Sequence, residues 1–178
     1  MSINDFNSEL QGHEGGENGS RHILLLYDDE QSLTNVLQAS ESLTKKNWFR
    51  VCCGPESHSG IEFLKKHDWT DVTLSPYTRL LDDTRQYVSE VWKRVIDEAG
   101  DLQSCVMGFM TGDLCHQSSI RNALTVEESY NSNKINGVMY CPYILKDLLH
   151  GSVGDILDLV KNHDQSFLLQ KDKLYKIG

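Results

Sequence analysis

The feature that most constrains the fold is the run HILLLY at 22–27, which is apolar at nearly every position. A continuous run of this kind is typical of a β-strand buried on both faces, because a half-buried strand alternates apolar and polar residues. Further short apolar runs at 49–53, 105–110 and 137–141 also predict strands. Since segments with helical periodicity separate them, we predict an α/β fold with a mostly parallel sheet and helices on both faces.

Apolar residues at a spacing of three and four predict the helices. The four clearest stripes are Leu33, Val36, Leu37 and Leu43; Val88, Val91, Trp92, Val95, Ile96 and Ala99, with Gly100 as the stop; Ile120, Ala123, Leu124 and Tyr130; and Val153, Ile156, Leu157 and Val160. The S-x-x-E pattern at Ser59–Glu62 predicts a capping box that starts a shorter helix. The runs 166–169 and 173–177 predict a closing hairpin, whereas 68–83 fits no single pattern.

Residues 1–21 contain four glycines and four acidic residues and almost nothing apolar. Such a segment cannot bury enough surface to offset the entropy of ordering it, so we expect a disordered tail. The remaining residues, 22–178, are predicted to form one domain, because 178 residues suit a single domain with a sizeable core.

Composition excludes several classes of function. The net charge of −9 argues against binding to nucleic-acid phosphates and against docking on an anionic membrane. No apolar run is long enough for a membrane helix, and the polar, acidic start does not match a secretory signal. The five cysteines include no CxxC pair, so we expect reduced thiols in a cytoplasmic protein, with no metal site and no cofactor.

The turn after the first predicted strand does not match a nucleotide-binding loop. A P-loop requires GxxxxGK[ST] at this position, whereas Asp28–Ser32 contains neither glycine nor lysine. The carboxylates of Asp28 and Asp29 are instead suited to cap the next helix and to interact with the positive end of its dipole. ATP hydrolysis at this turn is therefore disfavoured.

The same acidic pair and Pro142-Tyr143 resemble parts of phospho-receiver domains. Cys141 stands where those domains have lysine, and no aspartate ends a third strand at the spacing of a phospho-acceptor. A cysteine nucleophile with His116 or His163 as its base is a weaker interpretation, because any chain with seven histidines offers such pairs.

In parallel sheets, ligands bind outside the carboxyl ends of the strands. Residues predicted at or near these ends are the candidate ligand-binding residues Tyr27, Asp28, Met110, Asp113, Cys141 and Tyr143. Glu127 and Asn131, four residues apart on a predicted helix, supply polar groups if that helix lines the same crevice. The competing interpretation is that Met110 and Cys141 belong to the core.

The order and spacing of several segments resemble the MEDS sensory domain, named for methylotroph and methanogen regulators. These segments are HILLLYDDE at 22–30, FRVCCG at 49–54, VMGFMTGD at 106–113, VEESYN at 126–131 and VMYCPY at 138–143. The resemblance implies a RecA/KaiC-like fold without a functional P-loop and a role in sensing small hydrocarbon derivatives. It also adds His22 to the candidate ligand-binding residues. Leu114-Cys115 departs from the family, which tends to have an aromatic residue there.

We therefore expect a non-catalytic sensory module that binds a small organic ligand or a signalling protein partner. A degenerate RecA-like ATPase and a receiver-like phosphorylation switch are the alternatives. The sequence leaves open the ligand, the partner and the oligomeric state, monomer or homodimer.

Overall fold

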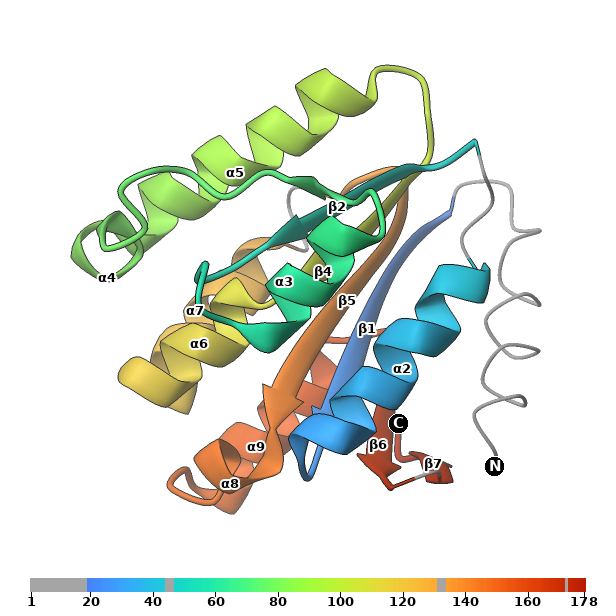
Figure 1. The fold of residues 1–178 in the computed structure, drawn as a ribbon. Helices are drawn as coiled ribbons and strands as arrows, with labels where there is room; N and C mark the ends of the chain where they lie inside the picture. Colours follow the sequence, from blue (N-terminus) through green and yellow to red (C-terminus); the bar gives the residue numbers. More distant parts are fainter. Residues whose placement is uncertain (1–18, 44–46, 131–133, 172) are drawn as a thin grey trace.

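In the computed structural model, a seven-stranded sheet forms the centre of the molecule (Figure 1). The structure describes residues 19–43, 47–130, 134–171 and 173–178. The strand order is β3-β2-β4-β5-β1-β6-β7, and every pairing is parallel except that of β6 with β7. The strands are β1 (Ser20–Tyr27), β2 (Phe49–Cys53), β3 (Thr70–Asp71), β4 (Ser104–Gly108), β5 (Gly137–Ile144), β6 (Gln165–Gln170) and β7 (Lys173–Lys176).

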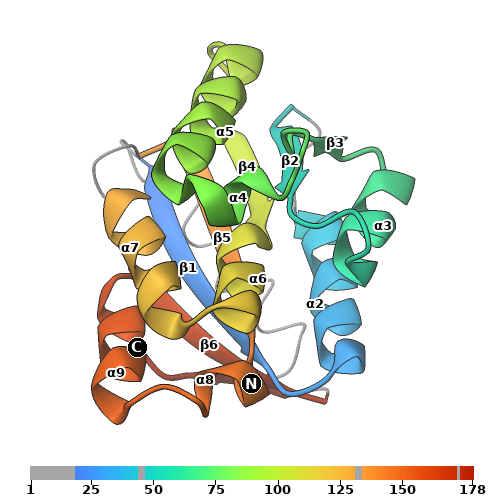
Figure 2. The ribbon, with the colours of Figure 1, turned by 90° about the vertical axis from the view of Figure 1, so that its left-hand side faces the viewer.

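Helices cover both faces of the sheet, as Figures 1 and 2 show. The described helices are α2 (Glu30–Leu43), α3 (Ser59–Lys66), α4 (Arg79–Asp82), α5 (Thr84–Ala99), α6 (Met110–Gln117), α7 (Ile120–Tyr130), α8 (Leu145–Leu148) and α9 (Val153–Lys161). α2 and α3 pack on one face, and α5, α6, α7 and α9 pack on the other. The predicted fold class is confirmed, and the topology is consistent with a RecA-like fold. No described helix is both long and apolar enough to cross a membrane.

Strand β1 lies inside the sheet between β5 and β6, which explains its continuous apolar run. Its side chains alternate: Leu24 and Leu26 pack under the α5–α9 layer, whereas Ile23 and Leu25 pack under α2 and α3. The same alternation places His22 on the α5–α9 face. The buried part of this inner strand therefore begins with a histidine instead of an aliphatic residue.

Several predicted elements have the expected positions. The strand at 49–53, the helix ended by Gly100, the helix at 120–130 and the closing hairpin are all present. Gly100 has φ 56° and ψ −122°, a positive-φ conformation that glycine adopts far more readily than other residues.

The predicted boundary of the tail is wrong by two residues, because β1 includes Ser20 and Arg21. The amide of Gly137 donates to the carbonyl of Gly19 at 3.0 Å, so β5 extends the pairing to that point. Residues 1–18 lie outside the described part of the chain.

Two strand ends differ from the prediction. Met110 is the first residue of α6, which the apolar run at 105–110 concealed. β5 continues through Pro142 and Tyr143 to Ile144. Its pairing with β4 ends at Tyr140 whereas its pairing with β1 continues, so Pro142 needs no amide hydrogen on the β4 side.

Three local predictions about helices are also wrong. The N-cap of α3 is His58, whose side chain accepts from the Gly60 amide, and Ser59 instead donates to Glu30. Ile96 is exposed on α5, and on α9 the buried residue is Leu159, whereas Val153 and Leu157 face outward. The unassigned segment 68–83 contains β3 and α4.

Candidate functional site

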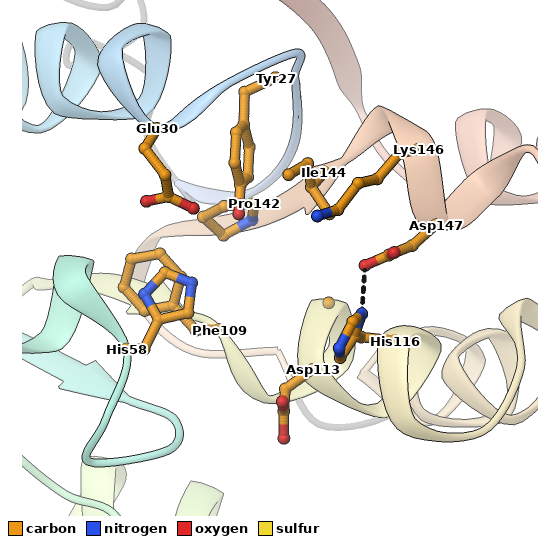
Figure 3. A pocket seen from close by; sticks show the side chains of 11 residues that line it. Tyr27, Glu30, His58, Phe109, Asp113, His116, Pro142, Ile144, Lys146 and Asp147 are labelled. Carbon is orange, nitrogen blue, oxygen red and sulfur yellow. Dashed lines mark hydrogen bonds and ion pairs between the residues drawn. The ribbon is translucent and has the colours of Figure 1, made fainter.

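A cavity of about 180 Å³ opens at the carboxyl ends of the central strands (Figure 3). We call it the edge cavity; it is lined by Tyr27, Glu30, His58, Phe109, Gly112, Asp113, His116, Pro142, Ile144, Lys146 and Asp147. Tyr27 is the last residue of β1, Phe109 follows β4, and Ile144 ends β5. This is the position where α/β sheets bind ligands.

Close packing of backbone forms one wall of the edge cavity. A Cβ atom added at Gly112 would lie 2.3 Å from the carbonyl oxygen of Pro142, so only glycine lets α6 approach β5 this closely. The approach places Asp113 and His116 of α6 beside the cavity (Figure 3).

His58 and Phe109 form an aromatic wall, with ring centroids 4.2 Å apart. The Nδ1 atom of His58 accepts from the amide of Gly60 at 3.0 Å, so the proton of the neutral ring is on Nε2. Burial lowers the pKa of His58, which makes the ring neutral near pH 7. Burial, and then the charges of Glu30 and Asp147, raise the pKa of Tyr27, so its hydroxyl remains a hydrogen-bond donor.

The charged groups around the edge cavity are mainly acidic. Its lining includes three acidic residues and one lysine: Glu30, Asp113, Asp147 and Lys146. Asp147 lies 3.0 Å from Nδ1 of His116, the pair joined by the dashed line in Figure 3. Such a lining favours a neutral or cationic molecule over a phosphate or a carboxylate.

The turn between β1 and α2 is closed by its own side chains. Asp29 Oδ1 accepts from the amide of Ser32 at 2.8 Å, and Asp28 Oδ1 accepts from the hydroxyl of Ser32 at 2.6 Å. The predicted helix-capping role of Asp29 is confirmed, and the Ser32 hydrogen bonds lower the pKa of its carboxyl group. Asp28 is not among the residues that line the edge cavity.

A second group of functional side chains lies inside the core, between the sheet and α7. We call it the core cluster; its members are His22, Glu127, Cys141 and His163. One ligand atom of each residue lies within 4.8 Å of those of the other three, and all four residues are buried.

Glu127 is the centre of this core cluster. Its Oε2 atom lies 3.0 Å from Nε2 of His22, 3.7 Å from Nε2 of His163 and 3.7 Å from Sγ of Cys141. Its Oε1 atom accepts a hydrogen bond from the hydroxyl of Tyr143 at 2.5 Å. The Sγ atom of Cys141 also lies 3.3 Å from Nε2 of His22.

Backbone carbonyls orient both histidines. Nδ1 of His22 lies 3.1 Å from the carbonyl oxygen of Asn162, and Nδ1 of His163 lies 2.7 Å from that of Leu159. A carbonyl oxygen can only accept, so each Nδ1 carries a proton and each Nε2 points at the carboxylate. Nε2 of His163 has no hydrogen-bond partner among the described residues, although it is buried.

Burial alone would raise the pKa of Glu127, but the attraction of His163 and the hydrogen bond from His22 outweigh it and lower the pKa to about 2. Burial lowers the pKa of His163 to about 4. Burial and the neighbouring Glu127 raise the pKa of Cys141 and Tyr143 well above their usual values. Near neutral pH the core therefore holds a buried carboxylate beside a thiol and a phenol that stay protonated.

A cavity of about 10 Å³ adjoins the core cluster, with room for one water-sized species and too little for an organic ligand. Its walls are apolar and aromatic, from Trp92, Met110, Tyr130 and Met139 among others. The ring of His22 packs against Tyr130, with centroids 4.4 Å apart.

The predicted ligand-binding residues thus divide between two places. His22, Met110, Glu127 and Cys141 meet at the small cavity, and Tyr143 joins them through Glu127. Tyr27 and Asp113 line the edge cavity, Asp28 belongs to the turn, and Asn131 lies outside the described residues.

Sequence reasoning named His163 only as the base of a cysteine nucleophile, left it out of the candidate ligand-binding residues, and missed most of the wall of the edge cavity. His163 follows α9 with no spacing motif linking it to His22 or Glu127, so no local pattern could identify it. The signal that existed was a histidine at the start of a buried strand, where an aliphatic residue is expected.

No protein-family model matches the chain, and no curated protein matches it significantly. It resembles a solved structure described as "Structural study of Project ID PH0250 from Pyrococcus horikoshii OT3", with a TM-score of 0.55 and 8% sequence identity. The match covers 99% of this chain and 91% of that chain. At this identity, the likeness shows the fold alone.

Proposed function

We propose that this protein is a non-catalytic, cytoplasmic sensory module of MEDS type that binds a small organic molecule in the edge cavity. The observation that carries the proposal is the cavity itself, which lies where α/β sheets bind ligands and combines an aromatic wall with a few polar groups. Five free and buried cysteines support a reducing compartment.

The lining defines the class of ligand. Phe109, Pro142 and Ile144 offer apolar contacts, and Tyr27 and His58 offer hydrogen-bond donors. The acidic groups favour an amine or an alcohol over a carboxylate or a phosphate. The turn at Asp28 and Asp29 supports a small-molecule sensor over a degenerate ATPase. Its carboxylates already accept the hydrogen bonds that a phosphate would need.

The test uses three probes with three carbon atoms each: n-propylamine, n-propanol and propionate. Two-dimensional amide NMR of the full chain should show shifts around Phe109 and Ile144 with the amine and the alcohol and weaker shifts with propionate. Ile144→Trp should abolish the shifts by filling the cavity. Leu149→Trp, at a residue that is 76% exposed, is the matched control and should leave them intact.

Equal binding of all three probes, or binding unaffected by Ile144→Trp, would contradict the proposed site. Absence of binding by every probe would favour the alternative, a protein partner that docks on this chain.

A further inference from the structure

The geometry points to a further site: we propose that the core cluster is a zinc site in which His22, Glu127, Cys141 and His163 are the four ligands. It goes beyond the proposed sensory function and does not depend on the edge cavity, from which its ligands are separate.

The donor atoms lie close to the separations that a tetrahedral zinc ion requires. Zinc–ligand bonds of about 2.0–2.3 Å place neighbouring ligand atoms about 3.3–3.8 Å apart. Four of the six separations in the core cluster are 3.0, 3.3, 3.7 and 3.7 Å, and the other two are no longer than 4.8 Å, so small side-chain shifts bring the four atoms to these distances. Two imidazole nitrogens, one thiol sulfur and one carboxylate oxygen are also ligand types that zinc accepts.

The protonation pattern calls for a cation. Both histidines donate through Nδ1 to backbone carbonyls, so Nε2 is the ring nitrogen of each that is available to bind a metal ion. Both Nε2 atoms face the carboxylate of Glu127, and the buried Nε2 of His163 has no hydrogen-bond partner among the described residues. A proton on His22 would join only that ring to the carboxylate, whereas a divalent metal ion can bind Nε2 of both histidines, the carboxylate and Sγ of Cys141 together.

The surrounding groups act as an outer shell that orients the ligands. Metal-binding histidines typically donate their second ring N–H to a carbonyl or a carboxylate, as His22 and His163 do here. Tyr143 is a positioning residue: its hydroxyl holds Oε1 of Glu127, which leaves Oε2 to face the histidines and Cys141.

The ligands come from β1, α7, β5 and the segment after α9, so the ion would join four distant parts of the chain. All four ligands are protein side chains and all are buried, which leaves no coordination position for substrate. A closed site of this kind stabilises the fold, as structural zinc sites do.

The test uses the full chain without an affinity tag. Protein purified without chelator should contain about one zinc per chain by mass spectrometry of its metal content. After removal of zinc, titration with Co²⁺ should give the visible bands of tetrahedral cobalt and a near-ultraviolet thiolate-to-cobalt band. Cys141→Ser should lose the thiolate band, whereas Cys115→Ser, at another buried cysteine, should retain it.

Two further variants separate ligands from neighbours. His163→Gln should weaken zinc binding by more than about 100-fold, beyond the range for outer-shell changes. His116→Gln, at an exposed histidine, should leave it unchanged. Tyr143→Phe should retain the cobalt spectrum but weaken the affinity about 10–100-fold, as expected for a positioning residue.

The proposal is overturned if the wild-type protein contains no zinc and shows no thiolate band with Co²⁺, a result that does not depend on whether any variant folds. It is also overturned if the thiolate band persists in Cys141→Ser. Neither result affects the binding of amines in the edge cavity, so the two proposals fail separately.

Discussion

The Nε2 atom of His22 lies 3.0 Å from Oε2 of Glu127, in the core between the sheet and α7. The contact joins the start of β1 to α7, and only 4% and 2% of the two side chains are exposed. A buried carboxylate is costly unless it is paired and hydrogen-bonded. The packing of α7 on the sheet therefore depends on this polar contact as well as on apolar burial.

Removing the carboxylate should destabilise the protein strongly. Glu127→Ala leaves His22, His163 and the Tyr143 hydroxyl without their shared partner, and breaking a buried charged network of this kind costs about 3–5 kcal/mol. Urea denaturation in the presence of a chelator measures this loss without any contribution from metal. Glu128→Ala, at the exposed neighbouring residue, should change the free energy of unfolding by less than about 0.5 kcal/mol. Equal effects of the two substitutions would mean that the network contributes nothing to stability.

The hydroxyl of Tyr143 should make its own contribution to the free energy of unfolding. Tyr143→Phe removes only the oxygen that donates to Oε1 of Glu127, and a hydrogen bond to a charged group contributes about 1.5–3 kcal/mol. The same denaturation assay applies, with Tyr175→Phe on the exposed face of β7 as the control. A loss no larger than that of the control would show that the Glu127 carboxylate is held by the histidines alone.

The fold could be predicted because buried strands and amphipathic helices differ in periodicity. The start of α6 could not be predicted, because the apolar run at 105–110 passes from β4 into the helix without a break in composition. The extension of β5 through Pro142 was hidden because a proline ordinarily argues against a central strand.

The core cluster was partly predictable. His22, Glu127 and Cys141 were candidate ligand-binding residues, and alternation along β1 and β5 explains why His22, Cys141 and Tyr143 face the same helices. The sequence predicted no metal site because it contains no local ligand spacing. The proximity of His163 to Glu127 depends on how the chain after α9 returns beside β1, which no local pattern specifies.

The chain should not bind Mg-ATP at the turn after β1. Asp28 and Asp29 already accept hydrogen bonds from Ser32, so their carboxylates occupy the start of α2 that a phosphate would need. Calorimetry should detect no binding at micromolar concentrations. Micromolar affinity that disappears in Asp28→Ala/Asp29→Ala would contradict this expectation and restore the degenerate ATPase as the better description.

The cysteines should react slowly in the folded protein, with a pH dependence that identifies the first to react. Only the thiolate is nucleophilic, and burial raises the pKa of Cys115 to about 11 and that of Cys52 to about 12. Modification by a disulfide reagent at pH 8 should therefore be much slower than in denaturant, where thiols titrate near pH 8.5. Because the raised pKa keeps the native thiol protonated, the reaction should accelerate as the pH rises toward 11, and Cys115 should react first.

The unfolded thiol of Cys115 ionises at a lower pH than the native thiol, so the contribution of Cys115 to stability is fully present below pH 8.5 and is lost as the pH rises to about 11. Cys115→Ser should remove the fastest phase of modification. Rapid labelling of Cys115 in the native protein at pH 8 would show that α6 opens readily and exposes the thiol.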